Sequence, residues 1–342
     1  MKKIITIGID LAKNVFAVHA VDALGQVVWT KPAVKRHQLL ELIGNIPPCL
    51  IGMEACTGAH HWAREFGKFG HTVRLVAPKF VIPYRLSGKR GKNDANDAAA
   101  ICETVTRPHM RFVPIKSIDA QAHLAVHRVR QGFIEERTAT INRIRGILAE
   151  LGIVLPQKAD VVRQQTGKLL EDLPGLASRV VGDLLNHLYL LDERVADYDH
   201  LLKQAAKEDE RSQRMMQVPG IGPTTATALL ASIGNGHEFK NGRQLAAWLG
   251  LVPGQYSSGG KPKLGKITKQ GDRYIRTLLI LGAKSVLAAA PEKTDRFSQW
   301  AQALRVRIGY GKALVAIAAK NARILWAMLS KREDFNLAAW SK

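Results

Sequence analysis

Three short segments rich in β-branched residues follow one another at the start of the chain, at residues 4–9, 15–21 and 26–30. Each has the length of a β-strand, and polar or glycine-containing turns separate them. Connections this short join antiparallel neighbours, so the pattern predicts an antiparallel meander. The chain is therefore expected to begin with a β-sheet.

Helices and strands alternate after these three segments. Residues 36–44 and 59–69 have helical patterns, whereas residues 49–53 and 72–76 have the apolar character of buried strands. Three strands followed by alternating helices and strands predict a mixed α/β sheet. Because the rest of the chain is mainly helical in pattern, the expected fold class is α/β plus all-α.

Two long helical segments follow the sheet. Residues 117–151 suggest a basic helix that Pro156 ends. Apolar residues between 177 and 202 recur in alternating steps of four and three, which is the a/d repeat of a left-handed coiled coil. This stripe fits a coiled coil between two copies of the chain, or a hairpin with the 117–151 helix of the same chain. Further helices are expected near residues 272–289, 294–308 and 312–331.

Four acidic side chains are candidates for one site. Asp10 ends the first predicted strand and Glu54 follows the fourth, and ligands collect outside the carboxyl ends of strands in α/β sheets. Asp94 and Asp97 lie three residues apart at the start of an alanine-rich helix, so both carboxylates face the same way. Taken singly, each acid is better explained without a site. The strand-end acids are then ordinary solvent-facing loop acids, and the helical pair is favoured by the positive end of the helix dipole.

Taken together, these four carboxylates offer the oxygen ligands that Mg²⁺ prefers. They can hold two Mg²⁺ ions about 4 Å apart, one activating the attacking oxygen and the other stabilising the leaving oxygen of a phosphodiester. The cofactor expected from this arrangement is Mg²⁺ in a two-ion site.

The charge of the chain predicts a polyanionic partner. The 342 residues carry a formal charge of +21 with a pI near 10.1, which favours nucleic acid. Residues 254–332 hold 16 Lys and Arg against 3 Asp and Glu, whereas residues 159–212 hold 7 against 11. A second basic stretch covers residues 79–92 and contains Lys79, Arg85, Lys89, Arg90 and Lys92.

Gly220 and Gly222 flank an apolar residue just before a predicted helix that runs to about Ser232. Such glycines leave backbone N–H groups open to a phosphate, which suits a helix-hairpin-helix contact with DNA. A glycine-rich turn between packed helices would give the same pattern.

Residues 250–263 have the composition of a loop and carry two hydroxyls, Ser257 and Ser258, beside several glycines. A serine in this cationic setting can be a phosphate contact, a phosphorylation site or a nucleophile, and chemistry alone favours the phosphate contact. The cations that follow are candidates for nucleic-acid binding, together with Lys89, Arg90 and Lys92 of the second basic stretch. They are Lys261, Lys263, Lys266, Lys269, Arg273 and Arg276.

The cysteines and the N-terminus suggest a cytosolic protein. Cys49, Cys56 and Cys102 are odd in number and have no paired spacing, so neither a disulfide framework nor a zinc site is indicated. The first ten residues have only a short apolar run that ends in an acid, unlike a signal peptide. No stretch approaches the roughly 20 apolar residues of a membrane span, so no membrane partner is expected.

The order of these motifs along the chain resembles a known family. The motifs are Gly8-Ile9-Asp10, Met53-Glu54-Ala55-Cys56-Thr57-Gly58, Asn93-Asp94-Ala95-Asn96-Asp97-Ala98, Pro219-Gly220-Ile221-Gly222 and Tyr256-Ser257-Ser258-Gly259-Gly260. They are similar to those of the insertion-sequence one-ten transposases, in the eleven-eleven subgroup that is related to the Piv-type DNA invertases and to bridge-RNA-guided recombinases. The resemblance extends over nearly the whole chain.

The resemblance implies a domain organisation. It places an RNase H-like (RuvC-like) catalytic domain at 1–112, long helices with an oligomerising coiled coil at 113–212, and a C-terminal transposase domain with a helix-hairpin-helix-like motif at 213–332. Residues 333–342 form a tail.

It also implies a mechanism and partners. Asp10, Glu54, Asp94 and Asp97 would bind the metal, and Ser258, the serine directly before a glycine, would be the nucleophile. Ser257 fills a position where relatives can carry another residue. The implied reaction is cleavage of DNA through a covalent phosphoserine, followed by strand exchange. The implied partners are donor and target DNA, a bridge RNA, and further copies of the chain as a dimer or tetramer in the bacterial cytoplasm, at the nucleoid.

Two other interpretations fit the residues. In the first, the acids form a two-metal nuclease or Holliday-junction resolvase that hydrolyses DNA with water, and the serines contact phosphate. In the second, the chain is a non-catalytic scaffold that binds nucleic acid through its glycine turn and basic helices.

Overall fold

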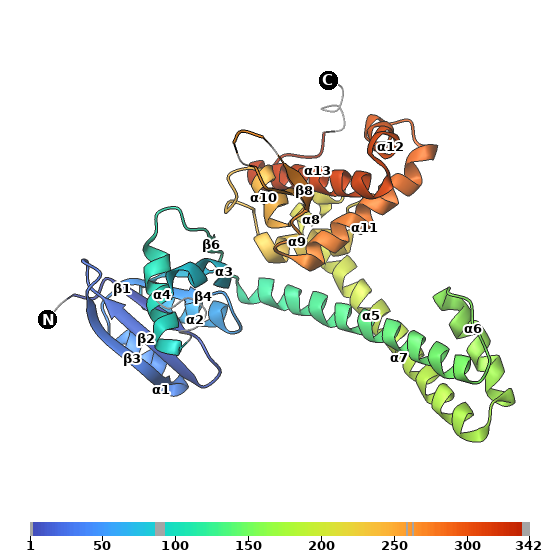
Figure 1. Cartoon of the computed structure of the whole chain (residues 1–342), viewed down its shortest axis with the longest axis horizontal. Coiled ribbons are helices and arrows are strands. Elements are labelled where there is room, and N and C mark those ends of the chain that lie inside the picture. Colours follow the sequence, from blue (N-terminus) through green and yellow to red (C-terminus); the bar gives the residue numbers. More distant parts are fainter. Residues whose placement is uncertain (1–2, 86–92, 258, 262, 337–342) are drawn as a thin grey trace. The chain divides into compact units, whose positions relative to one another are not determined.

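A computed structural model describes residues 3–85, 93–257, 259–261 and 263–336 of the chain (Figure 1). The chain forms two compact units, Met1–Ser117 and Ile118–Lys342. The first unit carries a large β-sheet, and the second is mainly helical.

The N-terminal unit is built on a six-stranded mixed sheet. Its strands are β1 (Thr6–Asp10), β2 (Val15–Val21), β3 (Val27–Lys35), β4 (Leu50–Glu54), β5 (Thr72–Val76) and β6 (Phe112–Val113). Their order is β3-β2-β1-β4-β5-β6, with β1, β2 and β3 antiparallel and with β4 and β5 parallel to β1. The predicted meander and mixed α/β sheet are confirmed, and the arrangement is consistent with an RNase H-like domain.

Strand β3 is longer than the sequence predicted. It extends to Lys35 through polar residues and through Pro32, which weaken the strand pattern. Proline is tolerated there because β3 is an edge strand of the sheet, where one row of backbone N–H groups has no partner strand.

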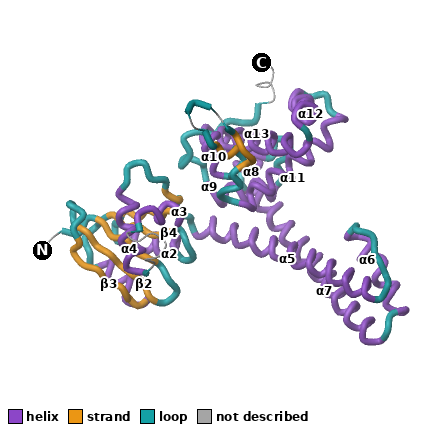
Figure 2. The backbone as a smooth tube through the Cα atoms, viewed as in Figure 1, coloured by secondary structure: helices purple, strands orange, loops and turns teal. Residues whose placement is uncertain are grey.

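Helices cover both faces of this sheet (Figure 2). They are α1 (Arg36–Gly44), α2 (Ala59–Lys68), α3 (Pro78–Val81), the 3₁₀ turn η1 (Ile82–Tyr84) and α4 (Asp94–Thr106). Ile7 and Ile9 of β1 are fully buried in one core with Trp62 of α2. Because side chains alternate along a strand, Gly8 points to the opposite face, where it meets α4.

Two long helices form a hairpin in the C-terminal unit. The elements of this region are α5 (Ile118–Glu150), α6 (Ala159–Leu169), η2 (Leu170–Asp172) and α7 (Gly175–Glu208). Ion pairs join Arg130 to Asp199 at 2.6 Å and Arg137 to Asp192 at 3.2 Å, so α5 and α7 run antiparallel.

The apolar stripe of residues 177–202 is buried inside this hairpin. Val181, Leu188, Val195 and Leu202 are each no more than 5% exposed. The structure therefore has the intramolecular hairpin that the repeat also allowed, and α5 of the same chain covers the stripe predicted to form an intermolecular coiled coil.

The remaining helices enclose a separate core. They are α8 (Glu210–Met215), α9 (Pro223–Ile233), α10 (Gly242–Trp248), α11 (Arg273–Ala289), the 3₁₀ turn η3 (Ala290–Glu292), α12 (Arg296–Ile308) and α13 (Tyr310–Lys331). Leu229, Leu279, Phe297 and Leu325 are fully buried in this core. Helices α9, α11, α12 and α13 correspond to the four helices predicted in this region.

A short hairpin occupies part of the predicted loop at 250–263. Its strands are β7 (Pro253–Gln255) and β8 (Leu264–Ile267), and they pair antiparallel. The sequence pattern did not predict β7, because its three residues include a proline and a glycine, which are depleted in strands.

Among the described residues, two helices are long and apolar enough to cross a membrane by length and composition, Arg273–Glu292 and Tyr310–Lys331. Both contribute fully buried residues, including Ile275 and Ile317, to the helical core. A core helix of a globular protein passes the same test of length and composition, so these two helices are explained by packing.

Candidate functional site

Asp10 and Glu54 lie at the same edge of the sheet. Strands β1 and β4 are parallel neighbours in a register that pairs Ile9 with Met53. The next residue in each strand is therefore an acid, Asp10 in one and Glu54 in the other. The sequence prediction that each acid ends its strand is borne out by the strand bounds.

Two glycines let α4 approach these strands closely. A Cβ atom on Gly8 would lie 2.1 Å from the Ala98 carbonyl oxygen, and one on Gly52 would lie 2.6 Å from a Val105 methyl carbon. Real Cβ atoms do not make contacts this short, so only glycine allows α4 to lie at this distance from the sheet.

This packing brings the first turn of α4 beside the strand ends. The Asn93 side chain accepts a hydrogen bond of 2.8 Å from the Asn96 N–H and so begins the helix at Asp94. Asp97 is 4% exposed, whereas Asp94 is exposed. The four predicted acids therefore share one region, which we call the acid cluster: Asp10, Glu54, Asp94 and Asp97.

The other three members of the acid cluster affect the pKa of Asp10. Burial and then the negative charges of Asp97, Asp94 and Glu54, in that order of size, together raise the pKa of the Asp10 carboxyl to about 6. Arg85 acts in the opposite direction. Cys56 lies in the same negative field, because burial and then Glu54 and Asp10 raise the pKa of its thiol.

Arg85 belongs to the basic stretch at 79–92 in the sequence, but in the structure it contacts acids. Its Nε lies 2.7 Å from Oδ1 of Asp97 and its Nη2 lies 3.9 Å from Oε1 of Glu54. All three side chains are at least 85% buried, at 15%, 6% and 15% exposure. No local pattern marks this arginine, because its partners come from distant parts of the sequence.

The acid cluster has the donors for a hard cation. Carboxylate oxygens are the ligands of Mg²⁺. Burial and then the neighbouring negative charges raise the pKa of Asp10, and a cation bound here would relieve the repulsion among those charges. Within the described residues, however, no three His, Cys, Asp or Glu side chains are already arranged around a common metal position. In this arrangement the guanidinium of Arg85 supplies the positive charge instead.

Ser258 lies outside the described residues, as do Lys89, Arg90 and Lys92. Its neighbour Ser257 is exposed in the β7–β8 hairpin, where its Oγ accepts hydrogen bonds from Gln255 Nε2 at 2.9 Å and from the Lys263 N–H at 3.2 Å. The Ser257 hydroxyl therefore helps to hold the hairpin together.

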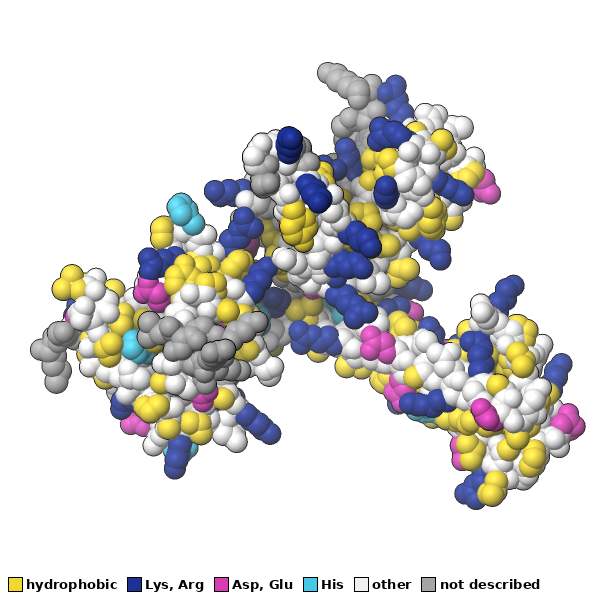
Figure 3. Space-filling view, viewed as in Figure 1, with side chains coloured by type: hydrophobic (Ala, Val, Ile, Leu, Met, Phe, Trp, Pro, Cys, Tyr) yellow, Lys and Arg dark blue, Asp and Glu magenta, His cyan; other side chains and the backbone are white. Residues whose placement is uncertain are grey.

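Most of the described cations near this hairpin are on the surface. On the face drawn in Figure 3, Lys and Arg side chains are spread over the C-terminal helices. The exposed candidates are Lys261, Lys263, Lys266, Lys269 and Arg273.

Arg276 differs from these candidates. It is 8% exposed, and its Nη1 donates hydrogen bonds of 2.9 Å to the carbonyl oxygens of Leu249 and Gln270. Its guanidinium therefore holds together the two ends of the 249–270 segment, so the prediction that Arg276 binds nucleic acid is wrong in this structure.

The two glycines of the predicted helix-hairpin-helix motif have different surroundings. Gly220 has φ +83° and contacts the backbone of α11, where a Cβ would lie 2.5 Å from the Gly282 carbonyl oxygen. This is the packed turn that the sequence left open as an alternative. Gly222 precedes α9 with open space around its Cβ position, so it stays the candidate for a phosphate contact.

Comparisons with known proteins cover most of the chain. Residues 7–153 match a family model described as Transposase (DEDD_Tnp_IS110), and residues 212–299 match one described as Transposase IS116/IS110/IS902 family. The acid cluster lies in the first match, and Gly220, Gly222 and Ser258 lie in the second.

Similar proteins match over nearly their full length. The chain is 46% identical to a probable family 20 transposase of Pseudomonas aeruginosa, over 95% of this chain and 96% of that protein. It is 40% identical to the transposase for insertion sequence element IS1111A of Coxiella burnetii, over 99% and 93% of the two chains. It is 36% identical to the transposase for insertion sequence element IS1328 of Yersinia enterocolitica, over 98% and 100%.

Proposed function

Since the chain belongs to the IS116/IS110/IS902 family of transposases, we propose that it cuts and rejoins DNA at the ends of an insertion sequence through a covalent serine intermediate. Membership of the family makes it an insertion-sequence transposase and thus a DNA-processing enzyme. Donor and target DNA are its substrates in this proposal, and the bacterial cytoplasm, at the nucleoid, is where it acts.

The observation that supports the catalytic part of the proposal is the convergence of four carboxylates on one sheet edge, where burial and then the charges of the other three raise the pKa of Asp10. Mg²⁺ held by Asp10, Glu54, Asp94 and Asp97 would neutralise the scissile phosphate and lower the cost of deprotonating the attacking oxygen. Because Arg85 occupies the cluster through Asp97 and Glu54, its side chain has to withdraw before a cation can use those oxygens.

The proposed chemical step belongs to Ser258. Its Oγ attacks the phosphorus of the scissile phosphodiester, the bond from phosphorus to the leaving deoxyribose oxygen breaks, and that oxygen takes up a proton. The serine proton passes to a carboxylate of the acid cluster. A deoxyribose hydroxyl of another strand then attacks the phosphoserine and releases the serine, so the phosphoester is conserved without ATP.

Assembly of two or four copies is also part of the proposal, because it would let Ser258 of one copy serve the acids of another. The buried stripe of α7 is used inside the chain, but a second set of apolar residues on α7 is exposed. Leu176, Val180, Leu190 and Leu201 are 81%, 47%, 54% and 48% exposed. At about 100° per residue they fall within roughly 80° of one another on the helix. Sedimentation of Leu190→Glu/Leu201→Glu beside the unchanged chain tests whether this face joins copies.

A bridge RNA completes the proposal. Base pairing of such an RNA with donor and target would carry the sequence information, which leaves the protein to bind backbones and shape. The charge of +21 fits a cargo of RNA and DNA and equally fits DNA alone, so this part of the proposal rests on the family resemblance. Recombination assayed with and without RNA transcribed from the ends of the element tests this part separately from the chemistry.

The nucleophile is tested with Ser258→Ala and, as its matched control, Ser257→Ala. Radiolabelled donor DNA is incubated with protein and Mg²⁺ and run on a denaturing gel. We expect a protein–DNA adduct and recombinant product with the unchanged chain and with Ser257→Ala, and neither with Ser258→Ala, which should still bind DNA. Recombination that survives Ser258→Ala would overturn the assignment.

The same gel separates the competing functions. Free DNA ends without an adduct would indicate hydrolysis by a nuclease or resolvase. DNA binding without any cleavage would indicate a scaffold. Calorimetric titration of Mg²⁺ into the chain and into Asp97→Asn tests the metal site without relying on activity, because loss of a ligand should weaken the binding.

A further inference from the structure

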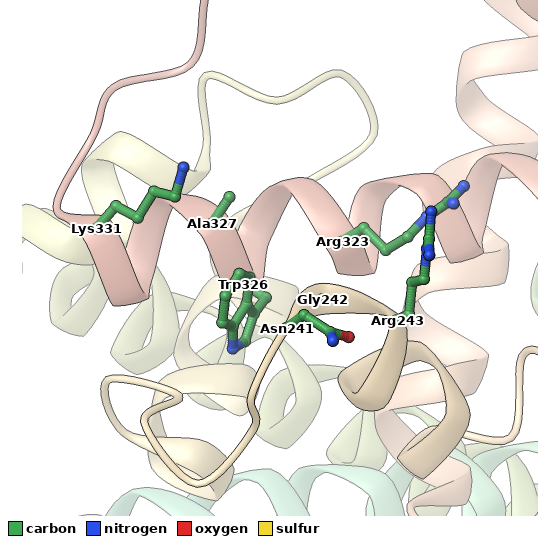
Figure 4. Close-up of a pocket in the computed structure, with 7 residues that line it drawn as sticks. All are labelled: Asn241, Gly242, Arg243, Arg323, Trp326, Ala327 and Lys331. Atoms are coloured by element: carbon green, nitrogen blue, oxygen red, sulfur yellow. The ribbon is translucent and has the colours of Figure 1, made fainter.

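A pocket of about 310 Å³ opens between the start of α10 and one face of α13 (Figure 4). None of the residues predicted to bind nucleic acid from the sequence lines it. Among the described residues, its walls carry three cationic side chains, those of Arg243, Arg323 and Lys331, and no carboxylate.

Close packing of the two helices creates this arrangement. A Cβ on Gly242 would lie 2.8 Å from both Cα and the carbonyl oxygen of Arg323, so glycine allows α10 to begin directly against α13. The next residue is Arg243, and Figure 4 shows the Arg323 side chain extending toward it.

The sequence of α13 shapes the rest of the pocket. Arg323, Ala327 and Lys331 follow in steps of four and therefore lie on one face of the helix. The methyl group of Ala327 leaves space between the two cations. Trp326 forms an apolar wall, because its Nε1 is already engaged, donating hydrogen bonds of 3.1 Å to the carbonyl oxygens of Gly236 and Phe239.

The positive charge of this pocket is poorly compensated. Within the part of the chain that the structure describes, Arg243 and Arg323 form no ion pair, and Lys331 is 3.9 Å from the exposed Glu333. Lys320 lies on the same helix, and burial and then the positive charge of Arg323 lower its pKa. Adjacent like charges repel one another unless an anion lies between them.

We propose that this pocket binds a phosphate group of a nucleic-acid backbone, with the adjoining sugar against Trp326. Guanidinium groups match the oxygens of a phosphate in paired hydrogen bonds, and two arginines can hold one phosphate from two sides. The volume is at the lower end of the range for small-molecule sites and exceeds what a bare phosphate fills. The pocket binds backbone and therefore positions the strand without reading its sequence.

This inference rests on the proposed function only in taking nucleic acid as the ligand, and it is independent of the serine and of the acid cluster. The test is accordingly a binding measurement. Fluorescently labelled duplex DNA, single-stranded DNA and RNA of one sequence are titrated with full-length protein in EDTA, and anisotropy is recorded at several salt concentrations.

Three variants are compared with the unchanged chain. Arg243→Ala/Arg323→Ala removes two cations from the pocket, whereas Arg307→Ala/Lys312→Ala removes two exposed cations elsewhere on the helical core. Ala327→Leu fills the pocket and leaves its charge unchanged.

We expect the pocket double variant to weaken binding at least about tenfold and to reduce the slope of log affinity against log salt by about one, because the two arginines hold one phosphate. The control double variant should lose only about threefold, as a general charge effect. Ala327→Leu should also weaken binding. The nucleic acid with the largest loss identifies the strand that the pocket holds.

Equal losses in the two double variants, together with unchanged binding by Ala327→Leu, would overturn the proposal and leave only diffuse charge attraction. Hydrogen exchange supplies a second measurement, because bound nucleic acid should protect peptides from α10 and α13 in the unchanged chain. If the pocket double variant fails to fold, Ala327→Leu and this protection decide the matter. Ser258→Ala should bind normally, so a failed serine mechanism would leave these results unaffected.

Discussion

Replacing Asp10 by Asn should stabilise the N-terminal unit at pH 8, although it removes a proposed metal ligand. The Asp10 carboxyl is partly buried beside three other acids, and this environment raises its pKa from 3.8 to about 6. Keeping it charged in the folded chain therefore costs free energy that is absent in the unfolded chain. Asn has nearly the same shape and carries no charge.

The sign and size of the effect follow from the two pKa values. An acid with a raised pKa binds its proton more tightly in the folded state, so stability is lost as the pH rises from about 4 to about 6 and stays low above that. At ~1.4 kcal/mol per pKa unit, the change from 3.8 to about 6 corresponds to ~3 kcal/mol. Partial exposure of the carboxyl to water reduces this to about 1–2 kcal/mol.

Pulse proteolysis in a urea series measures the stability of this unit within the full chain, with an N-terminal tag to follow its fragments. The urea midpoint of Asp10→Asn should exceed that of the unchanged chain at pH 8, and most of the difference should disappear at pH 4. Glu41→Gln, at an exposed position on α1, controls for the loss of one negative charge.

Two outcomes would refute this reasoning: no gain in stability at pH 8, or an equal gain at pH 8 and pH 4. Mg²⁺ adds a further comparison. A cation that binds only the folded chain stabilises it, so Mg²⁺ at pH 8 should raise the midpoint of the unchanged chain and narrow its difference from Asp10→Asn.

Three other substitutions test the packing and the charges. Gly8→Val should cost ~3 kcal/mol or more, seen as loss of the folded N-terminal unit by proteolysis, because its side chain would overlap the Ala98 carbonyl. His127→Gln should flatten the pH dependence of the stability of the C-terminal unit. Burial lowers the pKa of His127 from 6.5 to about 4, so the unchanged chain loses up to about 3 kcal/mol of its free energy of unfolding as the pH falls through that range. Arg85→Met should lower the urea midpoint at pH 8 without Mg²⁺, since it leaves Asp97 buried without its ion pair, and Mg²⁺ should restore more stability to this variant than to the unchanged chain.

The strand-end acids could be predicted because their signals are local. An apolar alternating run that ends in an acid marks Asp10, and the spacing of Asp94 and Asp97 marks one face of a helix. Their convergence depended on Gly8 and Gly52, which the sequence displays but whose close contacts with α4 appear only in three dimensions.

The apolar repeat on α7 could be predicted from the sequence, but the helix that packs against it could not. Its period correctly gave the face that is buried, but the same period serves a partner helix from the same chain or from another copy. The choice was made by contacts such as the 2.6 Å ion pair of Arg130 with Asp199, which join residues far apart in the sequence.

The number of basic residues in the sequence likewise did not indicate where each side chain lies in the fold. Arg85, Arg276 and Arg323 all lie in basic stretches of the sequence. The first pairs with acids, the second is buried against carbonyl oxygens, and the third lines an open pocket. Burial and partners separate these roles, and neither can be read from the identity of the residue.

The acid cluster is difficult to explain by stability alone. Burial and three neighbouring carboxylates raise the pKa of Asp10, and among the described residues Arg85 offsets this negative charge. A fold selected only for stability would replace some of these acids with neutral residues. Local conflicts of this kind are expected where function requires them. The repulsion among these acids also favours replacement of the Arg85 guanidinium by a divalent cation, because the cation would bind more carboxylate oxygens than one guanidinium can. The instability of the cluster is thus the physical reason to expect that it binds a metal when DNA is cut.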